Sequence, residues 1–487
     1  MTHKICLSGI VLSSLVLWVP LSNAQNPSAG AQQPLPANSA SLATAPAAKE
    51  AATGFPVIEE QEVVADTTPL AGAQNLTLGL PPSGHSFLLP SFGISSQAQT
   101  NPYNSSQSGS PAVIESTYLT GRLALSRTSG RSNLSLDYLT GGSFSTDSNQ
   151  GNSGIQNLHF SDMINWGRWS TMFGDQLSYT SQSPFGFGGG GGLNSLGVGL
   201  GNGVGSNAGF RNDFLPGQSI LITGSPQISN AAIGEVSYAL NHRASLTFVG
   251  SFGLLDFVNA GFQNSSYATF QGGYNYLLDR ENSIAVFYRF NDFWYANPSQ
   301  AFQGIQDHNV QMSFARRITG RLSFQVGAGP DTRVYHAPLA GPSTLVTWTA
   351  SSSLNYQYRR LAAGLTYNHS LTGGSGVFLG ATTDLLSGSV SRTFNRDWDG
   401  AITAGYSRNQ PIQQTTPNAN MISPQAWFIA ARVSRHFVRY GSFFIAYSAS
   451  GQSSLASVCT LPACTVSTLS SSVSIGYNWG LRSIVLE

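Results

Sequence analysis

Hydrophobic and polar residues alternate in segments of about ten residues along most of this 487-residue chain, from Glu115 to Trp479. Val473, Ile475 and Tyr477, for example, alternate with serine and glycine. Side chains on a strand point to opposite faces every second residue, so each segment has one apolar and one small polar face. A soluble β-protein buries the apolar face in a core, whereas a membrane barrel presents it to lipid on strands of about 9–11 residues. The segment length favours the barrel.

The connections between these segments alternate between short and long. Gly, Asn, Asp and paired charges, which suit tight hairpins, occupy the short turns at Ser129–Ser132, Trp166–Trp169, Leu240–Ala244, Leu278–Ile284, Thr319–Arg321, Arg359–Arg360, Asn395–Asp397 and Val438–Arg439. Longer connections rich in Gly, Ser, Asn and Pro lie between them, at Thr146–Gly154, Asn259–Ser265, Asn297–Asp307, Ala337–Ser343 and Asn409–Pro424. Tight turns on the periplasmic side and long external loops are typical of outer-membrane barrels, whereas a β-sandwich has no reason to alternate in this way.

The number of segments predicts the strand count. About 17 segments run from Glu115 to Leu481, and a short turn follows the first, so that segment starts outside. Because the N-terminal tail should be periplasmic, one upward strand is missing, and His85–Ala98 is the best candidate. We therefore predict an all-β fold, a transmembrane antiparallel β-barrel of about 18 strands over residues 85–487, or 16 if an end segment fails.

Composition agrees with a barrel and excludes helical spans. Charged residues make up 9% of the chain, against about 25% in typical soluble domains. After residue 22 no stretch reaches the 18 apolar residues that a spanning helix needs. The net charge of +1 gives no reason to expect a nucleic-acid partner.

The N-terminus predicts export. His3 and Lys4 precede the apolar run Ile10–Leu21, and the small residues that end at Ala24 form a cleavage site, so residues 1–24 are a predicted signal peptide. Residues 25–84 are rich in Ala, Pro, Gln and Ser, and we expect a disordered periplasmic tail. Its acidic-apolar stretch Glu59–Ala65 is the candidate contact for a periplasmic partner.

Two cysteines remain after signal removal. Cys459 and Cys464 are five positions apart in a polar connection, with Pro462 between them. Export to an oxidising compartment favours a small disulfide, and two free thiols are the alternative. No His or acidic residue lies nearby in the sequence, so we expect no metal there.

Aromatic residues cluster at segment ends, where the two interfacial girdles of a barrel would lie. In this architecture the chain resembles the porin-like outer-membrane β-barrels of Gram-negative bacteria, over about residues 85–487 and without pointing to a specific family. It departs from them at the C-terminus, because such barrels usually end on an aromatic recognised by the assembly machinery, and here Trp479 is followed by Gly480–Glu487. The resemblance implies outer-membrane lipid, lipopolysaccharide and the barrel-assembly machinery as partners. Large porins are often trimers, so a homotrimer stays open.

Residues on the polar face are the candidate pore lining. The same parity along the strands points the following side chains inward: Arg122, His159, Glu235, Arg289, Asn291, Gln311, Gln325, Arg333 and Arg432. Rings of arginine favour anions, whereas amide and aromatic side chains favour sugars. For each arginine the alternative role is a structural ion pair with a lumen acid, or a contact with a lipid headgroup near a turn.

The longest connection, Gln182–Ser229, is rich in glycine. It lacks the Gly-Lys-Ser/Thr of a phosphate-binding loop. With 18 strands it is the third external loop, which folds inward and narrows the channel in general porins. The resemblance therefore implies Phe210, Arg211, Asn212 and Asp213 as constriction residues. A flexible external loop without a pore role is the alternative.

The sequence carries no motif of catalysis. It has no Gly-x-Ser-x-Gly, no His-Glu-x-x-His and no CxxC pair, so we expect neither an enzyme nor a cofactor. The resemblance implies an outer-membrane channel for passive diffusion of small hydrophilic or anionic solutes. A polysaccharide-export barrel and a structural or adhesive scaffold without a pore are the alternatives.

Overall fold

The computed structural model divides the chain into residues 1–52 and residues 53–487. It describes only part of the second unit, namely residues 69–74, 86–100, 113–146, 152–180, 210–216, 226–259, 262–296, 304–336, 344–373, 376, 379–412, 423–438, 440–453 and 468–486. The predicted signal peptide, most of the predicted tail, Cys459 and Cys464 lie outside the described residues.

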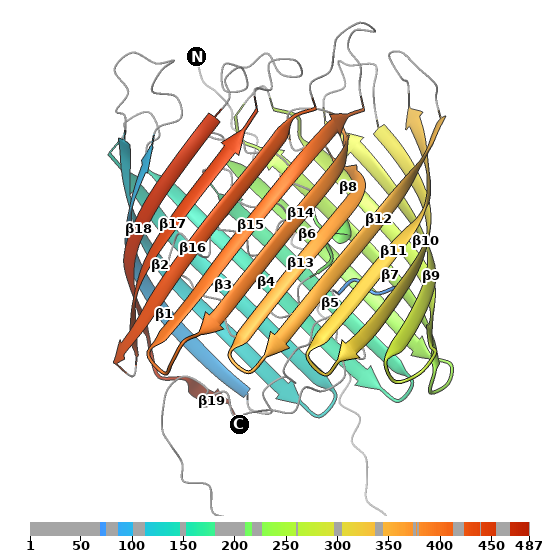
Figure 1. Cartoon of the computed structure of the whole chain (residues 1–487), viewed down its shortest axis with the longest axis horizontal. Helices are drawn as coiled ribbons and strands as arrows, with labels where there is room; N and C mark the ends of the chain where they lie inside the picture. The colour runs from blue at the N-terminus through green and yellow to red at the C-terminus, as the bar shows by residue number, and fades with distance from the viewer. Residues whose placement is uncertain are drawn as a thin grey trace, which may run out of the picture. The chain divides into compact units, whose positions relative to one another are not determined.

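Eighteen antiparallel strands form a closed barrel (Figure 1). They are β1 (Ser86–Thr100), β2 (Val113–Ser129), β3 (Ser132–Ser145), β4 (Ser153–Trp166), β5 (Trp169–Thr180), β6 (Gln227–Ala239), β7 (Ala244–Phe257), β8 (Ser265–Leu277), β9 (Asn282–Tyr295), β10 (Gly304–Thr319), β11 (Leu322–His336), β12 (Thr344–Tyr358), β13 (Leu361–Thr372), β14 (Ala381–Thr393), β15 (Trp398–Pro411), β16 (Gln425–Val438), β17 (Gly441–Gln452) and β18 (Thr468–Gly480). The barrel closes because β1 pairs with both β2 and β18. A short strand, β19 (Ile484–Leu486), follows Trp479 and pairs with the start of β1.

The predicted architecture is confirmed. The strand inferred at 85–98 is β1, and it brings the barrel to 18 strands rather than 16. Each predicted short turn joins an even-numbered strand to the next odd-numbered one, so these turns share one end of the barrel, here named the short-turn end. One boundary differs from the prediction, because β10 already begins at Gly304 and Asp307 therefore lies in a strand.

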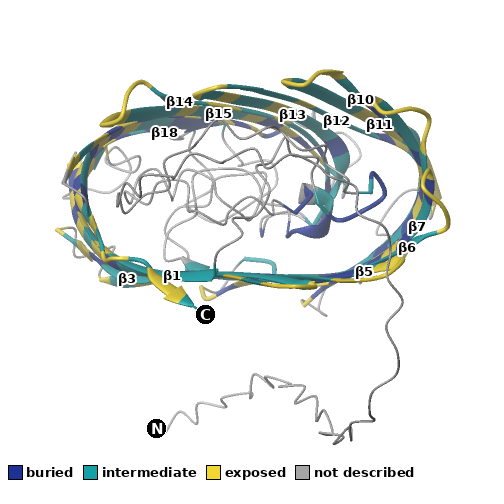
Figure 2. Cartoon of the chain, turned by 90° about the horizontal axis from the view of Figure 1, so that it is seen from below, coloured by how far each residue is buried: buried dark blue, intermediate teal, exposed yellow. Residues whose placement is uncertain are grey.

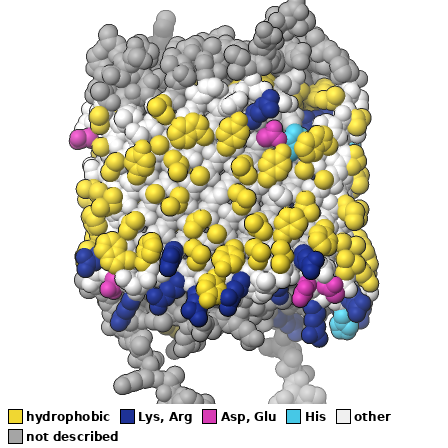
Figure 3. All heavy atoms as spheres, in the orientation of Figure 1, with side chains coloured by type: hydrophobic (Ala, Val, Ile, Leu, Met, Phe, Trp, Pro, Cys, Tyr) yellow, Lys and Arg dark blue, Asp and Glu magenta, His cyan; other side chains and the backbone are white. Residues whose placement is uncertain are grey.

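The two faces of the wall differ as the alternation predicted. Large apolar side chains such as Phe248, Phe270 and Val310 are exposed on the outer face. On the side of the barrel seen in Figure 3, hydrophobic side chains form a belt above a row of basic side chains near the short-turn end. Pairing between neighbouring strands satisfies the backbone polar groups, which allows strands to cross lipid. One ladder is incomplete, because β12 and β13 are paired only from Ala350↔His369 to Tyr358↔Leu361. Within the described residues no helix is long and apolar enough to span a membrane.

Candidate functional site

Two segments lie inside the barrel against the inner faces of β5–β9. They are residues 69–74 and residues 210–216, and together they are named the inner cluster (Figure 2, dark blue inside the ring of strands). The two segments touch through a bridge between Gln74 and Phe210. The Arg211 amide also donates a hydrogen bond of 2.8 Å to the carbonyl of Ala73. Residues 69–74 belong to the predicted tail, yet they line the barrel interior; for the rest of the tail a periplasmic location stays a prediction.

Side chains of the wall satisfy the backbone of residues 69–74. The Ala71 amide donates to Asn275 Oδ1 at 2.8 Å, and Gln271 Nε2 donates to the Ala71 carbonyl at 2.7 Å. The Ala73 amide donates to the carboxylate of Glu235 at 2.7 Å. Buried backbone groups need such partners because they have lost water. Glu235, predicted to line the pore, therefore anchors the inner cluster.

Glycines in the wall make room for the inner cluster. A Cβ atom at Gly273 would lie 2.5 Å from the Cβ of Ala71, and one at Gly174 would clash with the ring of Phe210. Cβ atoms do not approach so closely, so a side chain at either position would displace the segment that packs on it.

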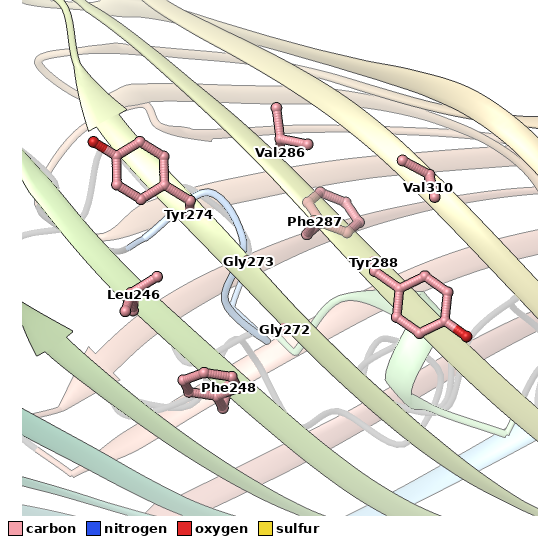
Figure 4. Close-up of a pocket in the computed structure, with 9 residues that line it drawn as sticks. All are labelled: Leu246, Phe248, Gly272, Gly273, Tyr274, Val286, Phe287, Tyr288 and Val310. Atoms are coloured by element: carbon pink, nitrogen blue, oxygen red, sulfur yellow. The ribbon is translucent and has the colours of Figure 1, made fainter.

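The wall is also hollowed on its outer face at this place. A depression of about 380 Å³ spans β7–β10, with Gly272 between Phe248, Tyr274 and Tyr288 (Figure 4). Gly272 lacks a side chain on the outer face, and Gly273 lacks one on the inner face, where Ala71 takes up the space. Residues 69–74 thus cover the wall on its inner face where Gly272 and Gly273 leave it without side chains.

Asp213 is the electrostatic centre of the inner cluster. Its carboxylate forms an ion pair with Arg289 of β9, with Nη2 and Oδ2 3.0 Å apart, and a second with Arg211 at 3.0 Å. Asn368 of β13 donates to the other carboxylate oxygen at 2.9 Å. Burial raises the pKa of Asp213, but the charges of Arg289 and Arg211 outweigh burial and hold the pKa at about 2. Ionised Asp213 therefore links β9 to β13 through the barrel interior.

Aromatic rings cover the same arginines. Arg289 lies 5.2 Å from the ring centre of Phe214 and 5.5 Å from that of Phe287, within the range of cation–π attraction. Arg211 lies 5.6 Å from the ring centre of Phe287. Both rings are almost fully buried. Arg289 is thus neutralised and desolvated by protein groups.

A second network of charges occupies the inner faces of β9–β11. Arg333 donates to Asp331 at 2.9 Å through Nε, and this nitrogen lies 3.7 Å from Asp307. Asn291 donates to the other oxygen of Asp307 at 2.7 Å. Arg333 Nη1 also donates to Thr382 Oγ1 of β14 at 2.5 Å. Arg333 and Asn291 therefore hold neighbouring strands together.

The remaining predicted lining residues also lie on the inner face, each with protein contacts of its own. Arg122 forms an ion pair with Asp137, and its Nε donates at 2.8 Å. Arg432 donates to Ser434 at 3.0 Å and lies over the Phe444 ring. The ring of His159 stacks on Phe210, Gln311 donates to Ser351, and Gln325 is half-buried beside Ala315 and Ser353 in the register. Whether any of them meets a solute stays a prediction.

The structure places the predicted constriction residues inside the barrel. Phe210, Arg211 and Asp213 are in the inner cluster, and Asn212 begins the same 3₁₀ turn, Asn212–Phe214. That they narrow a path stays a prediction. Sequence reasoning missed residues 69–74, although the small apolar run Leu70–Ala73 stands out in a polar tail. Within the described residues no group of three or more His, Cys, Asp or Glu is placed to hold a metal ion.

No protein-family model matches the sequence, and no curated protein matches it. Solved structures that resemble the fold include Pseudomonas aeruginosa OccK2 (OpdF), with a TM-score of 0.39 and 11% identity over 81% of this chain and 98% of that chain. Pseudomonas aeruginosa OpdQ has a TM-score of 0.39 and 9% identity over the same shares of the two chains. Acinetobacter baumannii OccAB3 has a TM-score of 0.38 and 8% identity over 82% of this chain and 99% of that chain.

Proposed function

We propose that this protein is a channel, not an enzyme, in the outer membrane of a Gram-negative bacterium, and that small hydrophilic or anionic solutes diffuse through it passively. The observation that carries the proposal is a closed 18-strand barrel with an apolar outer face and a polar inner face. The signal peptide directs export, and the short-turn end with the remaining tail faces the periplasm. Because the inner cluster covers the inner faces of β5–β9, the proposed passage runs along the inner faces of other strands.

The passage runs along the inner faces of β12–β14 near the short-turn end. The side chains there are hydroxyls and one amide, and each is half-buried or exposed; this set is named the hydroxyl wall and comprises Ser353, Asn355, Thr366, Ser387 and Ser389. Neutral polar groups of this kind replace part of the hydration shell of a sugar or a small ion without trapping it.

Charge selection is weak in this proposal. Three predicted lining arginines, Arg122, Arg289 and Arg333, each form an ion pair with an aspartate inside the barrel. Paired charges largely cancel at a distance, so they attract anions less than a ring of free arginines would. Neutral hydrophilic solutes are therefore better supported than strongly anionic ones.

Single-channel recording in planar bilayers tests the proposal. The purified barrel should give steady conductance steps, and under a salt gradient its reversal potential should lie close to zero. A reversal potential that indicates strong anion selectivity would contradict the weak charge selection. A folded barrel without conductance would contradict the channel and leave the scaffold alternative. Block by acidic glycans with indifference to small sugars would favour polysaccharide export.

A further inference from the structure

The barrel wall is split between β12 and β13. Their ladder runs from Tyr358↔Leu361 to Ala350↔His369 and stops there. Both strands continue, β12 back to Thr344 along β11 and β13 on to Thr372 along β14. Beyond Ala350, therefore, neither strand has the other as its partner.

The last contacts lie at the point of the split. The rings of Trp348 and His369 stack with centres 4.0 Å apart and planes at 11°. Thr349 Oγ1 donates to the His369 carbonyl at 2.9 Å. Beyond them Leu345 is 42% exposed, although the register with Arg333 places it on the inward side of β12. Beyond Ala350 the edge of β12 that faces β13 thus has no part of β13 paired to it.

The free ends of β13 and β14 lie inside the barrel. By strand parity Leu371 shares the outer face with Leu365, which is 48% exposed. Leu371 nevertheless packs, with Leu379, on inward-facing residues of β8–β10, namely Tyr267, Phe293, Tyr295 and Ile305. Thr382, the register partner of Leu371, accepts a hydrogen bond from inward-facing Arg333. The outer face of the β13–β14 end is therefore covered by the inner face of β8–β10.

A closed wall is available in the same register. Extending the ladder beyond Ala350↔His369 would pair Thr349 with Ser370, Trp348 with Leu371 and Thr347 with Thr372. Leu371 would then face lipid beside Trp348, as its parity requires, and the two threonines would face inward. The facing of every side chain agrees with this second arrangement.

The split and the closed wall satisfy different groups. The split leaves backbone groups of Thr344–Thr349 without a strand partner on the β13 side among the described residues, which is costly near lipid. The closed wall would pair Thr347–Thr349 with β13 but would remove Leu371 and Leu379 from their apolar cluster. Opposed terms of this kind give an element two discrete positions.

We propose that the ends of β13 and β14, Ser370–Gly373 and Leu379–Thr383, are a gate for the channel. In the tucked position they occupy the interior, and in the zipped position they complete the wall and widen the passage. The gate rests on the proposed function, but the zipping can be measured without any conductance.

A disulfide tests the zipped position. Directly opposite residues of an antiparallel ladder have Cβ atoms about 4.5–5.5 Å apart, near the spacing of a disulfide. In a Cys459→Ser, Cys464→Ser background, Thr347→Cys with Thr372→Cys should crosslink on mild oxidation, detected by mass spectrometry of tryptic peptides. Single-channel conductance should rise on the order of twofold and fall again on reduction. The matched control, Leu354→Cys with Leu365→Cys, joins an existing outer-face pair and should crosslink without changing conductance.

A second variant tests the tucked position without cysteines. Leu379→Ser removes an apolar side chain that is 4% exposed in the tucked cluster, and it should raise the ratio of large to small conductance states about tenfold. Leu386→Ser, on the exposed outer face of β14, should leave this ratio unchanged.

Two results would overturn the gate. One is a crosslink in the control pair with none between positions 347 and 372, and the other is a 347–372 crosslink that leaves conductance unchanged. A barrel in which every variant crosslinks but none conducts would contradict the channel itself, and with it any role of the zipping motion as a gate.

Discussion

The inner faces of β7–β10 and β12–β14 carry similar polar residues in opposite surroundings. Thr247, Thr269 and Ser313, on the first set of strands, are fully buried. Ser353, Ser387 and Ser389, on the second, remain half-buried or exposed. Strand parity assigns both groups to the inner face, yet only the second retains access to water. An inward-facing polar residue can therefore line the proposed passage only where nothing packs on it.

The same contrast holds for the ion pairs. Asp213 and Arg289 lie among aromatic rings, with side chains 8% and 6% exposed. Arg122 and Asp137, on β2 and β3, have side chains that are 15% and 16% exposed. The first pair belongs to a desolvated core inside the barrel, whereas the second retains more contact with solvent.

Removing the charge at the centre of the inner cluster should have the largest effect on the free energy of unfolding. Asp213→Asn leaves Arg289 and Arg211 without their carboxylate, and breaking a buried pair in this way costs about 3 kcal/mol. Asp137→Asn, in the more exposed pair, should cost about 1 kcal/mol or less. Denaturant unfolding in detergent, followed by tryptophan fluorescence, measures both. Equal losses would remove the distinction between the two regions.

Adding a side chain at a glycine on which the inner cluster packs should have the next largest effect on stability. Gly273→Val places a side chain where Ala71 and Phe287 already lie, and such overpacking costs about 2 kcal/mol. The amides of Ala71 and Ala73 should then exchange hydrogen faster in native-state exchange measurements. Gly234→Val is the matched control, because an added Cβ atom there would have no neighbouring atom within 4 Å. Unchanged protection of these amides in Gly273→Val would place residues 69–74 elsewhere.

The pH dependence of folding stability should follow from the pKa of Asp213. This pKa is about 2 in the folded protein, below its unfolded value, so the carboxylate contributes its full stability above about pH 4. About 2 kcal/mol should be lost as the pH falls from about 4 to 2, because the proton binds the unfolded state more tightly. In this pH window the free energy of unfolding should fall in the wild type and fall less in Asp213→Asn. An equal fall in both proteins would assign the acid sensitivity to another group.

The smallest effect should appear in ion selectivity. Arg122→Gln leaves Asp137 without its partner at a more solvent-accessible place, so the reversal potential should shift slightly toward cation preference. Arg289→Gln should destabilise the barrel and leave the selectivity of the folded fraction unchanged, because its charge is buried and paired. A larger selectivity shift from Arg289→Gln would show that solutes reach the packed side.

Local patterns predicted the wall well and its interior poorly. Hairpin chemistry and two-residue alternation determine strand number and the facing of residues such as Arg289, because these depend on neighbours in sequence. The partner of Arg289 is Asp213, brought to it by a connection of more than forty residues between β5 and β6. The split above Ala350↔His369 likewise breaks a pattern that both strands continue to obey. Contacts of this kind depend on how distant segments fill one space.

Cysteine accessibility tests the central contrast most directly. In the Cys459→Ser, Cys464→Ser background, Ser389→Cys on the hydroxyl wall should react with a charged, membrane-impermeant thiol reagent and lower the single-channel conductance. Ser313→Cys, on the inner face of β10, should remain unmodified in the folded barrel, because that position is fully buried. Modification at 313 together with protection at 389 would contradict the proposed passage.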